Sequence, residues 1–428
     1  MSLYKMIYLA GIFFRNKKIF DCYDKLKETE KWGVDRLQSY QLEKLKELVR
    51  FAYDNSPHYR EKYDQAGVKP DEILSLGDIS RLPLLSKEEV LGNADRIQIR
   101  DVGEKLYFSE TSGSTGRPLV FYRNQEWDAW HNASVMRGYS WHQVAPWEKN
   151  GYLWGYNLAP EKRLKVKALD LLQNRFRLFS YKEDDVELFL EKLKGASYLG
   201  GYSSMLYEVA KRVNSGGSSQ EFNLKMVKGT SEKIYDSYQA EVEKAFGRRI
   251  VSEYGSAEGG IIAFECAAGN MHLNMETAIA EIVDNEIVVT NLVSRSFPII
   301  RYKLGDYVQI DREQKCPCGM VHPIVKEVTG RVGAVVRGKR HSYPSLTLYY
   351  VFKNLTLEKQ LTINYQVVQE SAGKAVCYIE QTPALANLEL IRKEFEKYFG
   401  DDLDVDLVTG HVRSDFTSKR KDFISKLK

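Results

Sequence analysis

The sequence predicts an α/β protein with two domains: a large N-terminal domain with parallel sheets and a small α+β C-terminal domain. The chain has 428 residues, which is past the length at which one hydrophobic core stops growing. From about residue 197 onward, strand-like and helix-like segments alternate, and after Gly338 the pattern changes to a shorter, self-contained unit. We place the large domain at residues 1–333 and the small domain at residues 334–428.

The first elements are expected to be helices. Met6–Phe14 is an apolar run, too short for the roughly 20 residues of a membrane-spanning helix, and no signal-peptide cleavage site follows it. It predicts a packed or surface helix, with peripheral membrane contact through an amphipathic face left open. Gln41–Tyr53 carries apolar side chains on one stripe, which predicts an amphipathic helix.

The middle of the chain predicts a parallel sheet. Strand-like segments stand at Tyr198–Tyr202, Leu224–Lys228 and Arg249–Glu253. Helical patterns lie between them at Ser203–Val213 and Glu232–Phe246. This succession predicts right-handed βαβ units. Ligands gather at the carboxyl ends of such strands, so a ligand is expected near the segment Tyr254–Glu258.

The last part of the chain predicts further strands and the small domain. Residues 286–292 and 306–311 have strand patterns. In the small domain we expect strands at Leu361–Val367, Ala375–Glu380 and Leu403–Val408, and a helix at Leu385–Phe399.

Composition excludes several classes of protein. Hydrophobic residues make up 43% and charged residues 28%, which is typical of a globular protein. Lys and Arg number 62 against 58 Asp and Glu, and the resulting charge of +4 is too small to indicate a nucleic-acid partner. Five cysteines, an odd number, do not suit a secreted disulfide framework, so we expect a cytoplasmic protein. The oligomeric state stays open, a dimer included.

The strongest signal of chemistry is the run Thr111–Pro118, between the strand-like segments Leu106–Phe108 and Leu119–Tyr122. Its two glycines let the backbone turn so that N–H groups point at one anion, and its hydroxyls add donors. Such a loop suits a polyphosphate, and the alternative is an ordinary Ser/Gly turn. It is not a Walker A loop, because the GxxxxGK[ST] spacing is absent.

Other segments supply groups that a nucleotide needs. Tyr254 offers an aromatic face, and Glu258 a carboxylate for magnesium. Asp306 follows a glycine, where its carboxylate can accept both hydroxyls of a ribose. Gly330–Arg331 and the basic run Ser418–Lys421 come later. Taken singly, these are also what a core tyrosine, a capping aspartate and a solvated tail look like.

In this order, the segments resemble the adenylate-forming superfamily of acyl-CoA synthetases, peptide-synthetase adenylation domains and luciferases. The chain is most similar to the phenylacetate–CoA ligase branch, and especially to its relatives in capsular polysaccharide biosynthesis. Asn55–Arg60 and Leu82–Lys87 are similar to that branch's N-terminal signatures. The resemblance covers nearly the whole chain and implies a large N-terminal adenylate-forming domain and a small mobile C-terminal domain.

The resemblance also implies roles for residues. The residues implied to bind ATP are Ser112, Gly113, Ser114, Thr115 and Gly116 at the β- and γ-phosphates, Thr230, Ser231 and Glu232 along the adenine and acyl pockets, Glu253, Tyr254, Gly255 and Ser256 at the adenine, and Asp306 and Arg331 at the ribose. Glu258 would hold magnesium, and Lys419 would bridge the substrate carboxylate and the α-phosphate. Both are the implied catalytic residues, since a cation must stand between two anions that react.

The implied reaction joins a small-molecule carboxylic acid to AMP, releases pyrophosphate, and then passes the acyl group to an acceptor. The thiol of CoA is the expected acceptor; an amine or a sugar hydroxyl, in capsule or O-antigen biosynthesis, is the alternative. Ala257 stands where the superfamily has Thr or Ser, and Val332–Ala334 where its hinge is commonly acidic. These departures keep open a nucleotide-binding relative that does not turn over, and a zinc-stabilised interaction module is a third hypothesis.

Four further residues form a candidate zinc site. Cys266 and His272 are followed some forty residues later by Cys316 and Cys318. Two short clusters of thiol and imidazole ligands suit a tetrahedral structural zinc, and the alternative is four reduced, unrelated side chains. Similar clusters in some phenylacetate–CoA-ligase-like relatives favour zinc. Its expected role is to hold two loops together beside the nucleotide site.

Overall fold

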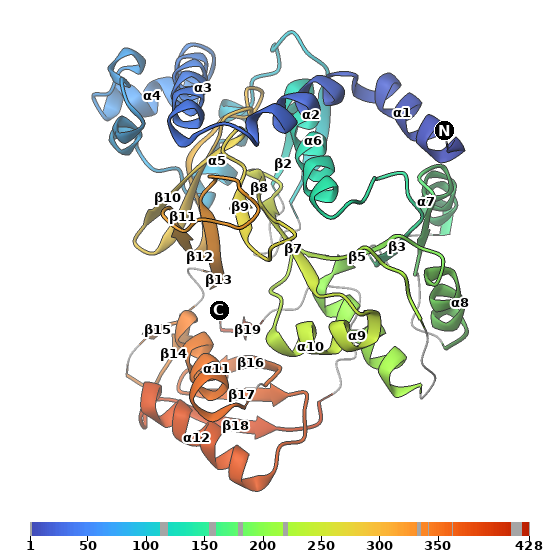
Figure 1. Cartoon of the computed structure of the whole chain (residues 1–428). Coiled ribbons are helices and arrows are strands. Elements are labelled where there is room, and N and C mark those ends of the chain that lie inside the picture. The colour runs from blue at the N-terminus through green and yellow to red at the C-terminus, as the bar shows by residue number, and fades with distance from the viewer. Residues whose placement is uncertain are drawn as a thin grey trace.

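The structure is a computed structural model that describes residues 2–111, 119–153, 160–178, 183–216, 221–331, 335–340, 342–361, 363–411 and 422–427. Within these residues, an 11-stranded sheet with covering helices forms the larger part, and a 4-stranded sheet lies in the C-terminal part (Figure 1). The expected fold class, a large α/β part with a small α+β part, is confirmed.

Helices dominate the N-terminal region. They are α1 (Leu3–Asn16), α2 (Lys18–Thr29), α3 (Val34–Asn55), α4 (Pro57–Gln65), α5 (Lys87–Ile97) and α6 (Gln125–Trp141), with 3-10 turns at Pro70–Glu72 and Leu76–Arg81. The helix expected at Gln41–Tyr53 is the second half of α3, and its stripe, which includes Leu45 and Leu48, is buried. Helices α2 and α6 pack on each other.

One part of the large sheet is parallel, as the sequence predicts. It holds β4 (Arg175–Arg177), β3 (Asn150–Leu153), β5 (Tyr198–Tyr202), β6 (Met226–Thr230) and β7 (Ile250–Ser256) in that spatial order. The helices of this part are α7 (Pro160–Leu172), α8 (Glu183–Leu193), α9 (Ser203–Ser215) and α10 (Asp236–Phe246). Helix α10 begins after the predicted Glu232, because Ser231 is left-handed (φ 67°) and Tyr235 is still extended.

The rest of the large sheet is antiparallel, which the sequence does not predict. Beyond β7 follow β8 (Gly260–Glu265), β9 (Met271–Leu273), β13 (Ile324–Arg331), β12 (Ile299–Asp311), β11 (Glu286–Asn291) and β10 (Ala278–Val283). The strand predicted at 306–311 is the end of the longer β12, which continues through a left-handed Gly305 (φ 85°). Strand β7 is therefore the boundary between the parallel and antiparallel parts.

The C-terminal part has its own core. Its elements are β14 (Val335–Arg337), β15 (Ser342–Pro344), α11 (Leu346–Lys359), β16 (Tyr365–Ser371), β17 (Lys374–Ile379), α12 (Leu385–Phe399), β18 (Asp404–Val408) and β19 (Phe423–Ser425). The sheet order is β18-β17-β16-β19, and Phe352 stacks on Tyr365 beneath it. Helix α12 has the predicted bounds, whereas the strand expected from Leu361 begins at Tyr365.

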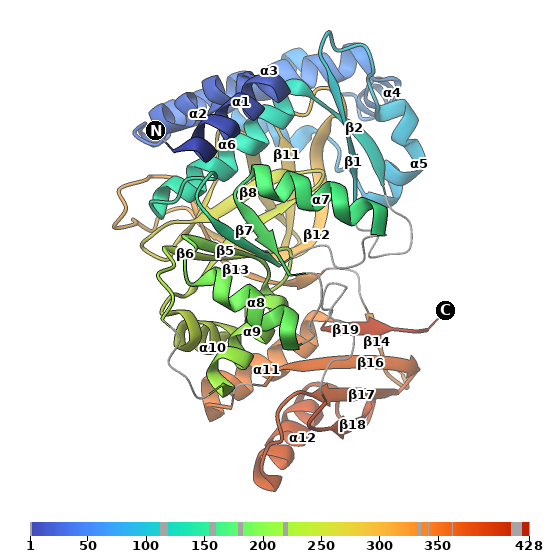
Figure 2. The same ribbon diagram turned by 90° about the vertical axis from the view of Figure 1, so that its right-hand side faces the viewer.

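The small sheet lies next to α9 and α10 (Figure 2). Lys211 of α9 forms an ion pair with Glu380 (2.6 Å), and Asn364 Nδ2 donates to the Tyr207 hydroxyl (3.2 Å). The predicted domain division at 333/334 falls within residues 332–334, which lie outside the described residues, and it stays a prediction.

Candidate active site and metal centre

Several of the predicted nucleotide residues lie together at the carboxyl ends of β6 and β7. Thr230 and Glu253 are register partners on these parallel strands. Lys228 Nζ lies 2.8 Å from Glu253 Oε2, and both side chains are largely buried. Sequence reasoning missed Lys228, because a lysine inside an apolar strand pattern carries no signal of its partner.

A second contact joins residues that are far apart in the chain. The Tyr254 hydroxyl donates to Asp306 Oδ2 at 2.9 Å, so the β7 motif and the β12 aspartate meet. The residue before Asp306, Gly305, has a left-handed backbone conformation that favours glycine. The Gly305 N–H donates to Glu286 Oε1 at 2.9 Å, and this bond fixes the backbone next to Asp306. The backbone of Arg331 on β13 is the register partner of Asp306.

Glu258 lies in the tight turn from β7 to β8. Its side chain is largely buried, its carboxylate accepts from the Tyr302 hydroxyl at 3.4 Å, and its carbonyl accepts from Asn291 Nδ2 at 3.1 Å. Gly255 cannot be replaced without a shift, since an added Cβ would lie 2.3 Å from the Gly260 carbonyl oxygen. The turn thus holds one carboxylate in a fixed position at the edge of the site.

The remaining residues of the β6–α10 and β7–β8 turns have contacts of their own. The Ser256 hydroxyl accepts the Gly259 N–H (2.8 Å), and Ala257 packs against the hydrophobic core. Glu232 accepts the N–H of Ser204 at 2.8 Å, at the N-terminus of α9. Glu232 therefore stabilises that helix end in this structure.

Two predicted parts of the site, Ser112–Gly116 and Lys419, lie outside the described residues. The strands on either side of the first are β1 (Leu106–Glu110) and β2 (Val120–Asn124), which pair antiparallel. The Thr111 N–H donates to the Leu119 carbonyl (3.0 Å), and the Leu119 N–H donates to the Thr111 hydroxyl (2.9 Å). These bonds hold the two ends of the predicted phosphate loop together.

A small cavity lies beside the Glu258 turn. Its lining includes Trp127 and His131 of α6, together with Gly259, Gly260 and Asn291. Trp127 Nε1 and His131 Nδ1 are buried without a hydrogen-bond partner among the described residues. Burial, with the nearby Arg123 charge, lowers the pKa of His131 to about 4, so the imidazole is neutral at pH 7.

The four predicted zinc ligands meet at one point. Their ligand atoms lie within 4.8 Å of one another, with Cys266 Sγ 3.6 Å from Cys316 Sγ and Cys318 Sγ 3.3 Å from His272 Nε2. A tetrahedron with metal–sulfur bonds of about 2.3 Å has edges of about 3.8 Å. The donor set and its spacing therefore fit zinc.

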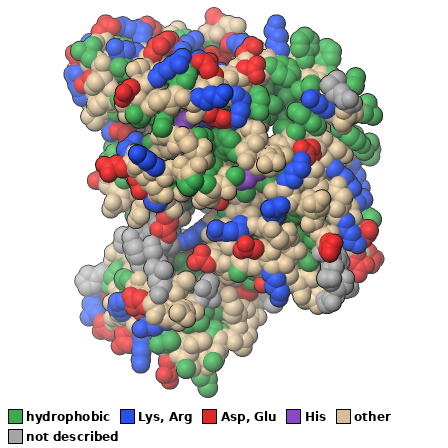
Figure 3. Space-filling model, in the orientation of Figure 1, with side chains coloured by type: hydrophobic (Ala, Val, Ile, Leu, Met, Phe, Trp, Pro, Cys, Tyr) green, Lys and Arg blue, Asp and Glu red, His purple; other side chains and the backbone are tan. Residues whose placement is uncertain are grey.

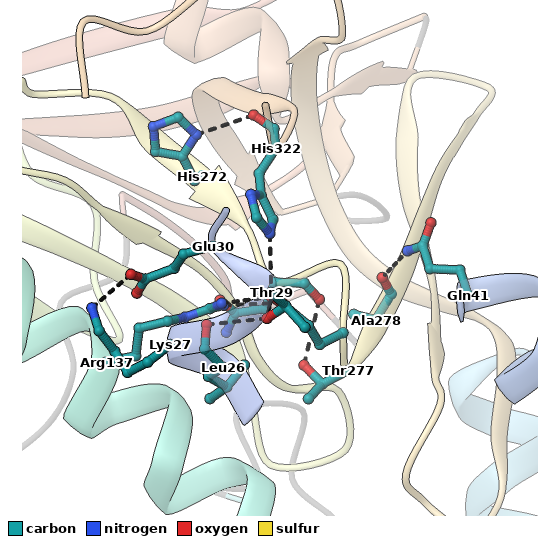
Figure 4. A network of polar contacts seen from close by, with 12 residues as sticks. Leu26, Lys27, Thr29, Glu30, Gln41, Arg137, His272, Thr277, Ala278 and His322 are labelled. Atoms are coloured by element: carbon teal, nitrogen blue, oxygen red, sulfur yellow. Dashed lines mark hydrogen bonds and ion pairs between the residues drawn. The ribbon is translucent and has the colours of Figure 1, made fainter. Parts of the chain in front are cut away.

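Groups behind these ligands fix the imidazole. His272 Nδ1 donates to the His322 carbonyl at 3.0 Å (Figure 4). The lone pair therefore stays on Nε2, which lies 3.3 Å from Cys318 Sγ. The His322 ring in turn lies 3.3 Å from Glu276 Oε1. Glu276 is fully buried and also binds Arg137 (2.6 and 3.1 Å) and the Thr29 hydroxyl (2.6 Å).

This network connects the cluster to helices α2 and α6 (Figure 4). Burial by itself would raise the pKa of the Glu276 carboxyl, but Arg137 and His322 hold it well below its usual range. The sequence analysis missed Arg137 and Glu276, which are 139 positions apart.

Comparison with known proteins agrees with this geometry. No protein-family model matches the chain. Protein CapK of Staphylococcus aureus is 24% identical over 339 residues, or 76% of this chain and 74% of that protein. Phenylacetate-coenzyme A ligase of Escherichia coli is 25% identical over 317 residues, or 67% and 70%. In sequence, the chain is thus similar to Protein CapK and to phenylacetate-coenzyme A ligase.

Solved structures of the superfamily share the fold. In its postadenylation state with 2-HIB-AMP, 2-hydroxyisobutyryl-CoA ligase matches with a TM-score of 0.72 and 17% identity, covering 93% of this chain and 92% of that one. The same enzyme with 2-HIB-AMP and CoA in the thioesterification state matches at 0.62. The arrangement of this chain is thus more similar to the former.

Proposed function

We propose that this chain is an AMP-forming acid–thiol ligase. It activates a carboxylic acid with ATP, releases pyrophosphate from the resulting acyl-adenylate, and transfers the acyl group to the thiol of CoA. The observation that carries the proposal is the contact between Tyr254, which shares its motif with Glu258 at the end of β7, and Asp306 of β12, because it joins two separate motifs that the resemblance assigns to one nucleotide site. The relatives named phenylacetate-coenzyme A ligase support the same reaction.

In this proposal, residues of the chain would offset the negative charge of the reacting groups. A carboxylate and the α-phosphate repel each other, so the reaction needs cationic groups placed before the two meet. Lys419, from the C-terminal segment, would supply one such charge, and Arg331 and Asp306 would hold the ribose. The Glu258 carboxylate suits magnesium, a hard cation that prefers oxygen ligands; when bound, magnesium would neutralise phosphate charge.

The cavity beside Glu258 has room for about one water molecule. Trp127 Nε1 donates, and the neutral His131 ring can donate or accept, so two buried polar atoms face this space. A water molecule bound there would satisfy these two atoms.

Zinc would have a structural role next to the candidate active site. Cys266, His272, Cys316 and Cys318 would hold one ion without an open position, and such closed sites are structural. The ion would tie the β8–β9 turn to the loop between β12 and β13. We expect the compartment to be the cytoplasm, since the five cysteines, all within the described residues, form no disulfide.

A second acceptor has its own support. The likeness to Protein CapK, together with the resemblance to capsular polysaccharide relatives, favours an amine or a sugar hydroxyl in place of CoA. The adenylation half of the reaction is the same in both cases. Only the second half, and therefore the effect of CoA, differs.

Pyrophosphate release with ATP and magnesium tests the proposal. Aryl-acetates, short hydroxy acids, amino acids and uronic acids are each supplied with and without CoA. Release that rises with CoA, with an acyl-CoA product by mass spectrometry, is expected. Release that CoA leaves unchanged would favour the amine or sugar acceptor. No release, with ATP still raising the melting temperature, would identify a relative that binds nucleotide without turnover.

A further inference from the structure

Helix α1 is apolar on both of its faces. Ile12 is buried against the body of the protein. On the opposite side, Leu3, Met6, Phe13 and Phe14 are exposed, Phe14 at 85%. Large apolar side chains on the outer face of a surface helix are ordinarily covered when they are adjacent, and those of α1 are not. The outer face of α1 is therefore a candidate binding surface.

Helix α7 has a similar outer face and contacts α1. Leu164, Leu169, Leu171 and Leu172 are exposed, Leu164 at 74%. Figure 3 shows hydrophobic side chains gathered where these two helices lie in Figure 1. We name these eight side chains of α1 and α7 the α1–α7 patch. Exposed apolar side chains are ordinary singly, but a continuous group of them marks an interaction surface.

The exposed charges among the described side chains of the two helices are of one sign. Helix α1 contains no acidic residue, and Lys17 is exposed directly after it. On α7, Lys165 and Lys167 are exposed. Among the described side chains of the two helices, Asp170 is the acidic one, and it is buried in an ion pair with Arg177 (2.9 Å). The surface thus presents apolar and cationic groups together.

We propose that the α1–α7 patch binds the surface of an anionic lipid bilayer. Apolar side chains on helices with a basic surround match the acyl boundary and the phosphate headgroups of such a surface. A second copy of the chain suits the patch less well, because a two-fold contact would bring basic groups against basic groups. None of the described helices is both long and apolar enough to cross a membrane, so the contact is peripheral.

Sedimentation with lipid vesicles tests this, independently of the proposed enzyme activity. The full chain is mixed with vesicles of phosphatidylglycerol and phosphatidylcholine, or of phosphatidylcholine alone. We expect roughly tenfold stronger binding to the anionic vesicles, weakened by high salt. The double variants Phe13→Ser/Phe14→Ser and Leu171→Gln/Leu172→Gln should each bind roughly tenfold more weakly.

Matched controls stand elsewhere on the surface. Leu74 and Leu385 are equally exposed, at 69% and 83%, so Leu74→Gln and Leu385→Gln should bind as the unchanged chain does. Lys165→Glu/Lys167→Glu should lose the preference for anionic lipid without removing apolar surface. Circular dichroism checks that each variant is folded.

Two results would overturn the proposal. One is that the unchanged chain does not sediment with anionic vesicles, or that the controls weaken binding as much as the patch variants. The other is a dimer by light scattering that Phe13→Ser/Phe14→Ser dissociates, which would make the patch a contact between copies of this chain.

Discussion

The candidate active site and the Cys/His cluster lie on the same sheet, yet they are built in opposite ways. The cluster is closed, since its four ligand atoms face one another and its imidazole is fixed from behind by the His322 carbonyl. We call the candidate active site open, because its predicted groups come from separate segments, Asp306 from β12 and Lys419 from the C-terminal part of the sequence. A closed centre completes the fold, whereas an open one is completed by its ligands. Changes at the two should therefore affect different measurements.

Among the predicted changes, Lys419→Ala should have the largest effect on activity, because Lys419 belongs to the candidate active site. Removing the one cation that would bridge both reacting anions should slow pyrophosphate release about 1,000-fold or more. ATP affinity and melting temperature should stay within error. Lys421→Ala is the matched control and should retain activity. The reverse result, with Lys421→Ala inactive, would show that the terminal motif is placed two residues away.

Arg137→Met should have the largest effect on stability. It leaves the fully buried Glu276 carboxylate without its guanidinium partner, and breaking such a pair costs about 3–5 kcal/mol. Urea unfolding measures this loss. The double variant Arg137→Met/Glu276→Gln should recover part of it, since no buried charge remains.

The same network predicts a pH dependence. The folded-state pKa of Glu276 is lowered, so its contribution to stability is present above the unfolded value of about 4.3 and is lost as pH falls through the folded value. Glu276→Gln should therefore be less sensitive to acid below about pH 4.5 than the unchanged chain. An equal acid sensitivity would contradict the assignment.

Metal removal tests whether the cluster serves the fold. Elemental analysis should give about one zinc per chain, and Cys318→Ser should lower that content. Chelation should lower the melting temperature by about 5 °C while ATP still binds, because zinc binding is coupled to folding. Cys22→Ala removes a cysteine that is not part of the cluster and should leave the zinc content unchanged. Loss of ATP binding together with zinc would contradict the prediction that the cluster and the candidate active site affect different measurements.

What could be predicted from the sequence depends on how far apart the partners lie in the chain. The parallel part of the sheet follows from neighbouring segments that alternate, and α12 was predicted to the residue from its apolar spacing. The cluster was recognisable because Cys and His are rare and stand in two short groups. Arg137 and Glu276 were not, since a single arginine in a helix pattern gives no sign of a carboxylate 139 positions away. The antiparallel pairing was missed for the same reason, although two of its strands were expected at residues 286–292 and 306–311.

Tyr254→Phe should have the smallest effect and distinguishes positions within the open site. It removes the hydroxyl that donates to Asp306 at 2.9 Å but keeps the ring. A neutral-to-charged hydrogen bond contributes about 1.5–3 kcal/mol, part of which the solvent returns, so the KM for ATP should rise roughly fivefold with kcat little changed. Tyr302→Phe is the counterpart, because its hydroxyl meets Glu258 instead. It should raise the magnesium concentration needed for half activity and leave the KM for ATP nearly constant. If both variants changed the KM for ATP, or both changed the magnesium requirement, Asp306 and Glu258 would bind the same ligand group. The proposal that Asp306 binds the ribose and Glu258 binds magnesium would then be wrong.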